Sequence, residues 1–531
     1  MHVDMQVNNL RSPGRTAVSI FSVRSKTLGV LARGLLLGAL VISQLAFALP
    51  ASAAAVSRPG ATPARSVDRS ARTIIARAAR GPTVYGALQT LQRSGQLAAE
   101  AYGEDSAIYT AALSAARHLS GTRRAELDSV IANVQQIATA GELIPSRLPA
   151  LMLTLERNTE LWSREPLPAA GGRLSFPESH LVWEYYPGQG IEIQWLATFG
   201  KANGYYDDGH DNEALRELLE EAIPLATQRA GGIAWEYLFH FDGGAPPWTS
   251  GLSQGTALQA LVRGYVRLHE PAFLTAAQRA LGVFQTPPSA GVRVAQPAGA
   301  LYAQYTYAPT DRILNGFIQA LNGLYEYAKL TGDPLGRQLF EAGDAEARAL
   351  VPSYDTGGWS KYDQYTESNL NYHELLTEFL QSLCQRTSEG EPGPAAAQPS
   401  AAIPGDQVYC TTAQRFTADL HTPPALRLLT HKLPEAVRGG VAIGLSKIAT
   451  VSITVRRGSR VVWTNRALVQ GGRPRLLWVT PRNGGAYSVS VAATDLAGNT
   501  AGTSGTIVLA PAARAAPPGG HHRGGGGAGR G

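Results

Sequence analysis

The stretch YAQYTYAPTDRILNGFIQALNGLYEYAKLTG, residues 302–332, joins a loop rich in tyrosine to an apolar helical segment. From Leu314 onward its apolar side chains recur three and four residues apart, the spacing of one helix face. Several other segments of residues 176–386 share this pattern, and the loops between them are rich in Trp, Tyr, Gly and Pro. The fold class that this predicts is mainly α, an (α/α) barrel or toroid whose loops line a cleft. Helical repeats are the competing interpretation, but no 34-residue period is found.

The regions on either side of this body have different patterns. Residues 81–175 have the three and four spacing of packed amphipathic helices. Residues 387–420 are dominated by Pro, Ala and Gly at their start and are predicted to be a linker. Residues 421–512 alternate apolar and polar side chains between tight turns, which predicts a small immunoglobulin-like β-sandwich. Residues 513–531 form a Gly-rich tail that we expect to be disordered.

The first 53 residues have the pattern of an export signal. Arg24, Lys26 and Arg33 precede an apolar run that ends in the small residues Ala-Ser-Ala at 51–53. Residues 54–80 are rich in Ala, Arg, Ser and Pro and are predicted to be a disordered linker. We therefore expect a secreted or cell-surface protein with no membrane span after cleavage. The alternative is an uncleaved anchor, although the run is shorter than the roughly 20 residues that span a bilayer.

Charge and cysteine content narrow the class of protein further. The net charge of +6 arises at the two ends, because residues 1–80 carry eleven Lys/Arg against two Asp/Glu and the tail adds three Arg. The body is net acidic, which argues against a nucleic-acid partner. Cys384 and Cys410 are the two cysteines of the chain. Export permits a disulfide between them, and two unpaired thiols are the alternative.

Four stretches carry Gly, Pro and aromatic residues that a plain helical bundle does not need. They are YYPGQGIEIQWLATFGKA (185–202), FHFDGGAPPWTSGLSQGTALQALVRGY (239–265), YAQYTYAPTDRILNGFIQALNGLYEYA (302–328) and YDTGGWSKYDQYTESNLNYHELLTEFLQSL (354–383). In this order they resemble the catalytic domain of the glucuronyl C5-epimerases, which convert glucuronate to iduronate within heparan-type chains. The resemblance covers roughly residues 180–386. It implies an (α/α) barrel, a uronic-acid polysaccharide as substrate, and a homodimer.

The resemblance also assigns roles to three tyrosines. The catalytic tyrosines of the family fall on Tyr305 and Tyr372, and a third active-site tyrosine falls on Tyr362. Epimerisation takes the C5 proton from one face of the sugar and returns a proton to the other, so two groups are needed. A phenol with a pKa of about 10 is a matched acid, and it is a strong base once a nearby cation or donor lowers its pKa. The order of the residues leaves open which tyrosine is the base.

The chain departs from the family next to the first of these tyrosines. Two glutamates usually stand there in the family, and Ala303 and Gln304 stand here. A second histidine of the family is also replaced, by Thr377 or a neighbour. These changes leave two other functions open. One is a polysaccharide lyase that uses the same proton abstraction, and the other is a non-catalytic glycan-binding protein of the cell surface.

Six further residues of the matched motifs are candidates for substrate binding. A guanidinium binds a carboxylate through two parallel hydrogen bonds, and a Trp ring packs on a sugar face. A histidine beside a catalytic tyrosine could orient the phenol. For each of these types, a structural ion pair or core packing is the alternative. The candidates are Arg263, Arg312, Gln254, Asn315, Trp248 and His373.

Cofactors are not required by this chemistry. The chain has no Cys and His spacing typical of zinc and no Gly-rich phosphate loop. The loop acids Glu184, Asp242 and Asp355 are candidates to bind calcium together with backbone carbonyls. Helix capping is the alternative role for these acids.

Overall fold

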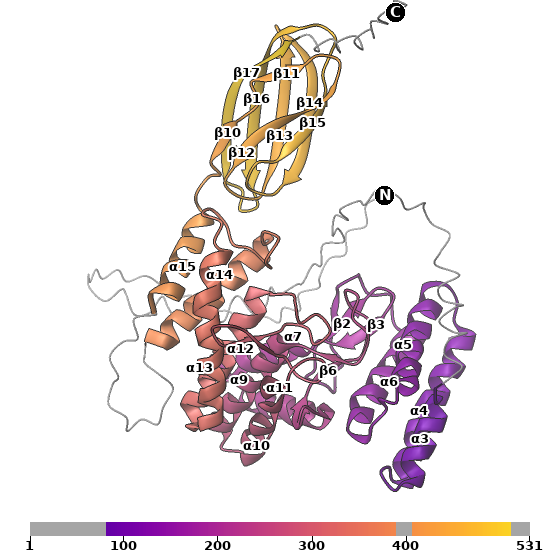
Figure 1. The fold of residues 1–531 in the computed structure, drawn as a ribbon. Coiled ribbons are helices and arrows are strands. Elements are labelled where there is room, and N and C mark those ends of the chain that lie inside the picture. Colours follow the sequence, from indigo (N-terminus) through magenta and orange to yellow (C-terminus); the bar gives the residue numbers. More distant parts are fainter. Residues whose placement is uncertain (1–80, 389–405, 511–531) are drawn as a thin grey trace, which may run out of the picture. The chain divides into compact units, whose positions relative to one another are not determined.

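The computed structural model describes residues 81–388 and 406–510 (Figure 1). The expected export signal, the linker at 54–80 and the Gly-rich tail lie outside the described residues. The described chain is mainly helical up to Asp419, with short strands between the helices. From Leu426 to Ala510 its regular elements are β-strands. The prediction of a helical part followed by a β part is therefore confirmed. None of the described helices is long and apolar enough to cross a membrane.

The helical part begins with four helices and a three-stranded antiparallel sheet. Helices α4, α5 and α6 pack on one another, and α3 packs on α4 and α5. The side chain of Thr83 caps the first helix by accepting a hydrogen bond from the amide of Gly86 at 3.1 Å. The elements are α3 (Val84–Arg93), α4 (Ala99–His118), α5 (Gly121–Thr139), η3 (Pro145–Arg147), α6 (Leu148–Arg164), β1 (Arg173–Leu174), β2 (Trp183–Tyr186) and β3 (Gly190–Ile193).

Two buried polar side chains fix the β2–β3 hairpin to the helices. Glu126 of α5 accepts hydrogen bonds from the hydroxyl of Tyr185 and from the amides of Gly188 and Gly190, at 2.8 to 3.0 Å. Asn158 of α6 bonds both the amide and the carbonyl of Ile191, at 2.8 and 2.7 Å. Because each of these buried groups is satisfied by the hairpin backbone, the hairpin has one position on the helices.

The body of the helical part is built around two long buried helices, α9 and α12. They pack on each other; α9 also packs on α7 and α10, and α12 on α13 and α14. Both are buried on nearly all sides, which explains their apolar sequence. The helices are α7 (Trp195–Asp208), α8 (Asn212–Ala222), η4 (Ile223–Leu225), α9 (Gly251–Leu268), α10 (Pro271–Ala280), α11 (Gly282–Gln285), α12 (Leu314–Thr331), α13 (Pro334–Leu350), η5 (Val351–Tyr354), α14 (Leu370–Ser388) and α15 (Asp406–Asp419).

The two central helices cross at glycines. A Cβ atom on Gly323 of α12 would lie 2.1 Å from the carbonyl oxygen of Gly255 in α9. A Cβ atom on Gly255 would lie 2.6 Å from the Cα of Ala320. These are contacts with backbone, so the helices would have to move apart to admit a side chain at either position.

Short antiparallel hairpins connect the helices of the body. They are formed by β4 (Thr227–Arg229) with β5 (Gly232–Ala234), β6 (Glu236–Tyr237) with β7 (Trp248–Thr249), and β8 (Arg293–Ala295) with β9 (Ala300–Tyr302). Glu236 on β6 forms buried ion pairs with Arg147 and Arg229, both at 2.6 Å. The arginines hold the pKa of Glu236 below its usual value although burial opposes this. The buried ion pair between Arg147 and Glu236 therefore links the N-terminal part of the chain to the body.

The predicted linker at 387–420 contains a helix. Helix α15 covers Asp406–Asp419 and packs on α14. Its buried side chains are Tyr409, Ala413 and Phe416, which belong to the main hydrophobic core. The predicted linker is therefore too long. The Pro- and Ala-rich residues before α15 favour a linker, and the three buried residues of the helix are too few to give a clear helical period.

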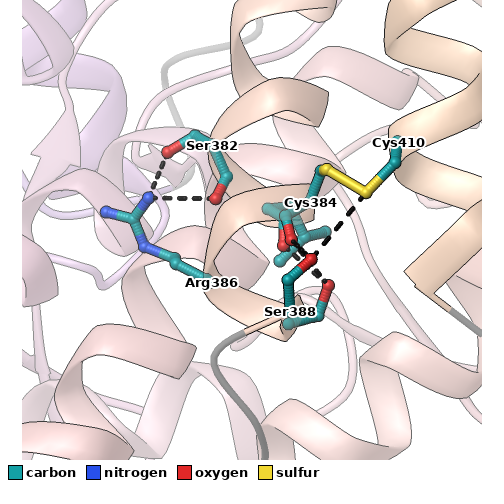
Figure 2. Close-up of a disulfide and its surroundings, with 7 residues drawn as sticks. Ser382, Cys384, Arg386, Ser388 and Cys410 are labelled. Atoms are coloured by element: carbon teal, nitrogen blue, oxygen red, sulfur yellow. Dashed lines mark hydrogen bonds between the residues drawn. A yellow bond between two sulfur atoms is a disulfide. The ribbon is translucent and has the colours of Figure 1, made fainter. Parts of the chain in front are cut away.

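A disulfide joins the last two helices of the helical part. Figure 2 shows Cys384 of α14 bonded to Cys410 of α15, with the hydroxyl of Ser388 beside the Cys410 sulfur at 3.9 Å. The same hydroxyl donates to the carbonyl of Cys384 at 2.7 Å. The bond spans 26 residues of sequence.

The β part consists of two sheets around one core. The five-stranded sheet has the order β11-β17-β16-β13-β14 and the three-stranded sheet the order β10-β12-β15. Side chains alternate between buried and exposed along β13 and β16, as the sequence predicts. The strands are β10 (Leu426–Leu428), β11 (Lys432–Pro434), β12 (Arg438–Leu445), β13 (Ala449–Arg457), β14 (Arg460–Val469), β15 (Arg475–Val479), β16 (Gly485–Asp495) and β17 (Thr500–Ala510).

The helix crossing gives a first test. We expect Gly323→Ala to lower the free energy of unfolding by about 1–3 kcal/mol, because the new methyl group overlaps the Gly255 carbonyl. Urea denaturation followed by the helical circular dichroism signal measures this change. Gly103→Ala is the matched control, since Gly103 is an exposed residue of α4 with open space around its Cα. We expect it to be neutral or stabilising by up to about 1 kcal/mol, and equal effects of the two changes would contradict the account.

The disulfide gives a second test. We expect the double change Cys384→Ser, Cys410→Ser to destabilise the protein by roughly 3–4 kcal/mol, the loop-entropy value for a loop of this length. The measurement is the same urea titration, with and without a reductant. A reductant should lower the stability of the parent protein and leave the double variant unchanged. A parent protein that does not respond to complete reduction would argue against a stabilising bond.

Candidate active site

A pocket that is open to solvent lies where several loops of the helical part meet. Strand β2, the start of α7, the β6–β7 hairpin, the first turn of α9, the loop after β9 and the start of α14 all contribute to it. The lining residues are Glu184, Tyr186, Gln194, Leu196, Tyr237, Phe239, Phe241, Trp248, Ser250, Leu252, Ser253, Gln304, Tyr305 and Tyr372.

The three tyrosines expected to be catalytic come together at this pocket. Tyr305 and Tyr372 line it. The ring of Tyr362 lies 4.6 Å from that of Tyr372, centre to centre, and its hydroxyl interacts with the hydroxyls of both other tyrosines. Gln304, which stands in place of a family glutamate, donates its amide N–H to the Tyr305 hydroxyl at 2.9 Å. The site is thus a linked group of three phenols.

The pKa of each of these phenols is raised. Burial is the largest cause for Tyr305, Tyr362 and Tyr372. The interaction with Tyr362 lowers the pKa of its two neighbours, and the Gln304 amide also lowers that of Tyr305, but burial outweighs both. The expectation that a nearby cation or donor lowers the pKa of one phenol is therefore not met, because the donors present are outweighed by burial and the described lining residues include no Lys, Arg or His.

Aromatic rings form one wall of the pocket. Trp248 stacks on Tyr237 with ring centres 4.3 Å apart, and its edge meets Tyr305 at 5.6 Å. Its indole N–H donates to the carbonyl of Phe239 at 2.8 Å, which fixes the ring. Tyr305 in turn stacks on Tyr307. Trp248 is thus both a packing residue and part of the pocket surface, so the two roles considered for it coexist.

A polar network continues from the hydroxyl end of Tyr237 along the pocket lining. The Tyr237 hydroxyl bonds the Oε1 of Gln194 at 3.0 Å and the hydroxyl of Ser253 at 2.6 Å. Gln194 donates its Nε2–H to the Tyr186 hydroxyl at 2.7 Å. Glu184 lies beside this network with 1% of its surface exposed. Among the described residues, neither of its carboxylate oxygens has a hydrogen-bond partner.

Both candidate arginines lie outside this lining. Arg263 forms an ion pair with Glu326 at 2.5 Å and another with Asp207 at 3.1 Å, behind the pocket on α9. The Nη2 of Arg312 donates to the side chain of Gln296 at 3.2 Å. The ion pairs of Arg263 correspond to the structural alternative that was considered for it, whereas the printed side-chain partner of Arg312 is an amide and not an acid.

The other three candidates are buried side chains of the helical part that do not line the pocket. His373 stacks on Trp359, its Nδ1 bonds Ser360 and its Nε2 bonds the carbonyl of Phe416. Burial lowers its pKa to about 4, so the ring is neutral.

The two amide candidates are also buried. Gln254 donates to the carbonyls of Ile233 and Ala280 and so ties α9 to two other elements. Asn315 is buried in the first turn of α12, and its side-chain atoms have no partner among the described residues.

The calcium candidates are dispersed. Glu184 lines the pocket, whereas Asp355 pairs with Arg415 at 2.9 Å and accepts from the amide of Gly357. Asp242 contributes to the raised pKa of Tyr305. In the described ranges, no three His, Cys, Asp or Glu side chains are grouped as a metal site. Calcium binding stays a prediction.

Several residues of the pocket were not among the expected site residues. Gln194, Tyr237, Ser253 and the Phe pair 239 and 241 were not singled out, and Glu184 was considered only for calcium or capping. The available signal was their position, because all lie in or next to the quoted stretches 185–202 and 239–265. Their convergence depends on tertiary packing that the sequence does not display.

The pocket thus brings together buried phenols and one carboxyl group, and comparison with known proteins relates this part of the chain to a family of epimerases. Residues 230–392 match the family model described as the D-glucuronyl C5-epimerase C-terminus. A D-glucuronyl C5-epimerase of Caenorhabditis elegans is 31% identical over 131 residues, which are 22% of this chain and 21% of that protein. The resemblance is thus confirmed over residues 230–392, which match the D-glucuronyl C5-epimerase family model.

Two other proteins are similar to parts of the chain. An uncharacterized protein of Methanocaldococcus jannaschii is 27% identical over 169 residues, 30% of this chain and 55% of that protein. The chain thus spans about a fifth and about half of these two curated relatives. The endo-beta-1,4-glucanase CMCax of Acetobacter xylinum matches 42% of this chain and 78% of its own, with 14% identity and a TM-score of 0.25, too low to indicate a shared fold.

The raised pKa values can be measured directly. We expect the phenolate absorbance of the free protein to contain no contribution from Tyr305 below about pH 10, because burial disfavours its charged form. The test is an ultraviolet pH titration of the parent protein and of Tyr305→Phe. The two curves should coincide up to about pH 10 and separate only above it. A difference that appears near pH 7 would show that a resting phenolate exists.

Proposed function

We propose that the chain is a uronyl C5-epimerase that converts D-glucuronate units of a polysaccharide or glycoconjugate to L-iduronate. The observation that carries this proposal is the meeting of Tyr305, Tyr362 and Tyr372 at one pocket, inside or beside the segment that matches the epimerase family. The pocket also has an aromatic wall of the kind that packs against sugar rings.

The proposed mechanism uses the two lining phenols on opposite faces of the sugar. One first releases its own proton to the solvent, because burial keeps it protonated in the free protein; as phenolate it then takes the C5 proton, and the electron pair of the C5–H bond moves into the carboxyl group as an enediolate. The other phenol gives its proton to C5 from the opposite face. Each turnover thus leaves the two tyrosines with exchanged protonation states. Tyr362 interacts with both hydroxyls, so we assign it the return of the proton from one to the other.

Finer features of the fold and its location belong to the same proposal. We propose that the body helices form an (α/α) barrel with the pocket at its mouth, and that the β part is immunoglobulin-like. We also propose that the protein works outside the cytoplasm. The apolar run that follows basic residues supports export, and a disulfide-bonded pair of helices suits that environment. The reaction requires no redox cofactor. Homodimer formation stays a prediction of the resemblance.

The reaction can be followed in deuterated water. We expect a chain of glucuronate and N-acetylglucosamine to gain deuterium at C5 and to show iduronate signals in the proton NMR spectrum. Tyr305→Phe and Tyr372→Phe should each lower the exchange rate roughly 10²–10⁴-fold, the usual effect of removing a general acid or base. Tyr365→Phe is the matched control, because Tyr365 lies in the same stretch and is 80% exposed.

Two outcomes would contradict the proposal. Ultraviolet absorbance from an unsaturated uronate would indicate a lyase, since elimination expels the 4-linked sugar from the same anion. Binding of the polysaccharide without exchange at C5 would indicate a glycan-binding protein. Equal rates for the three Tyr→Phe variants would remove the assigned roles even if exchange occurs.

A further inference from the structure

The buried carboxyl group of Glu184 is the feature of the pocket that the tyrosine mechanism does not use. The residue lies on β2, lines the pocket and has 1% of its surface exposed. Within the described ranges 81–388 and 406–510, neither oxygen has a partner at full hydrogen-bond geometry; Tyr186, Gln194 and Arg173 lie near enough to lower the pKa of the carboxyl group, but burial outweighs them. Buried polar atoms are normally satisfied, so two free oxygens in a pocket wall suggest that a ligand completes them.

The titratable groups around Glu184 do not supply a strong partner. The Nε of Arg173 on β1 lies 3.7 Å from Oε2, beyond hydrogen-bond distance. Glu192 stands directly opposite on β3, in the same ladder, and is itself buried. The remaining titratable neighbours are the phenols of Tyr186, Tyr237 and Tyr372, on β2, β6 and α14.

Charge decides what such a pocket can bind. No Lys, Arg or His occurs among the described lining residues, and Glu184 is the one carboxyl group among them. A uronate unit brings a second negative charge into the same confined space. Two carboxylates in one buried site do not both stay ionised, because each raises the pKa of the other. The bound state can therefore hold one proton more than the free components.

We propose that Glu184 is the residue that recognises the carboxylate of the uronate, and that it does so as a neutral carboxylic acid. On binding, the ionised side chain takes one proton from the buffered solvent, whose acid form is replaced by its base form, and the new O–H group donates a hydrogen bond to the uronate. No covalent bond of the sugar forms or breaks in this step. This inference rests on the proposed function, because it assumes a uronate in the pocket. It replaces the arginine that the sequence had suggested for this role.

The electrostatic environment favours this assignment. Burial raises the pKa of Glu184, with Arg173 opposing, and burial raises that of Glu192 well above its usual value. The affinity for a uronate should be greatest below the pKa of Glu184 in the free site, where the proton is already present. Above that pKa the affinity should fall about tenfold per pH unit, because each binding event then takes up one proton.

The test is calorimetric titration of the full chain with a glucuronate and N-acetylglucosamine oligosaccharide, between pH 5 and 9. Two buffers with different ionisation enthalpies give the number of protons taken up. We expect it to rise from near zero at the acid end to roughly one at the alkaline end. Glu184→Gln keeps a neutral hydrogen-bond donor, so it should bind with no uptake and with pH-independent affinity. Glu184→Ala should bind roughly tenfold or more weakly.

Two controls isolate the carboxyl group. Glu192→Gln changes the cross-strand neighbour, which is buried but does not line the pocket, and should keep the proton uptake of the parent. The parent protein titrated with the carboxyl-reduced oligosaccharide should show no uptake. This second control does not depend on whether any variant folds.

The outcomes separate the inference from the proposed function. Uronate binding without proton uptake at any pH, or uptake that persists in Glu184→Gln, overturns the inference, while exchange at C5 would still support the epimerase. Proton uptake without exchange at C5 supports the inference and overturns the epimerase. A parent protein that binds no uronate chain at all overturns both.

Discussion

The close crossing of α9 and α12 is the constraint on which the rest of the helical part depends. Gly255 and Gly323 let two backbones touch where any side chain would separate them. Helix α9 begins at the pocket with Ser250 as its cap, and α12 begins shortly after the loop of Tyr305. At its first turn, Gly316 leaves only enough room for Gln304, the side chain that bonds the Tyr305 hydroxyl. The packing of α12 therefore helps to fix the position of the Tyr305 phenol.

The pocket combines groups that burial makes reluctant to ionise. Three phenols and one carboxyl group meet there, and burial raises the pKa of each. Such groups are favoured in their neutral, protonated forms and not as charged side chains. An anionic substrate that binds beside them therefore favours uptake of a proton by the site.

The sequence predicts some of this arrangement and leaves other parts open, for physical reasons. The spacing of apolar residues in helices and their alternation in strands are local patterns, so the helical part and the β part could be predicted from the sequence. Tyr305, Tyr362 and Tyr372 could be named because the motifs around them resemble those of a family. The role of Glu184 could not, because the hairpin that carries it is positioned by Glu126 and Asn158 from distant helices. Arg263 had the right chemistry for a carboxylate, but acids on two neighbouring helices occupy it.

The pocket is assembled from two stretches of chain, and the family model matches only the second of them. The tyrosine loops lie in or next to the stretch shared with the epimerases, residues 230–392, whereas Glu184, Tyr186 and Gln194 come from the hairpin before it. That hairpin is held by N-terminal helices through the carboxylate of Glu126. A change in the hairpin or in its supporting helices would therefore alter one part of the pocket lining while the loops that carry the tyrosines stayed the same.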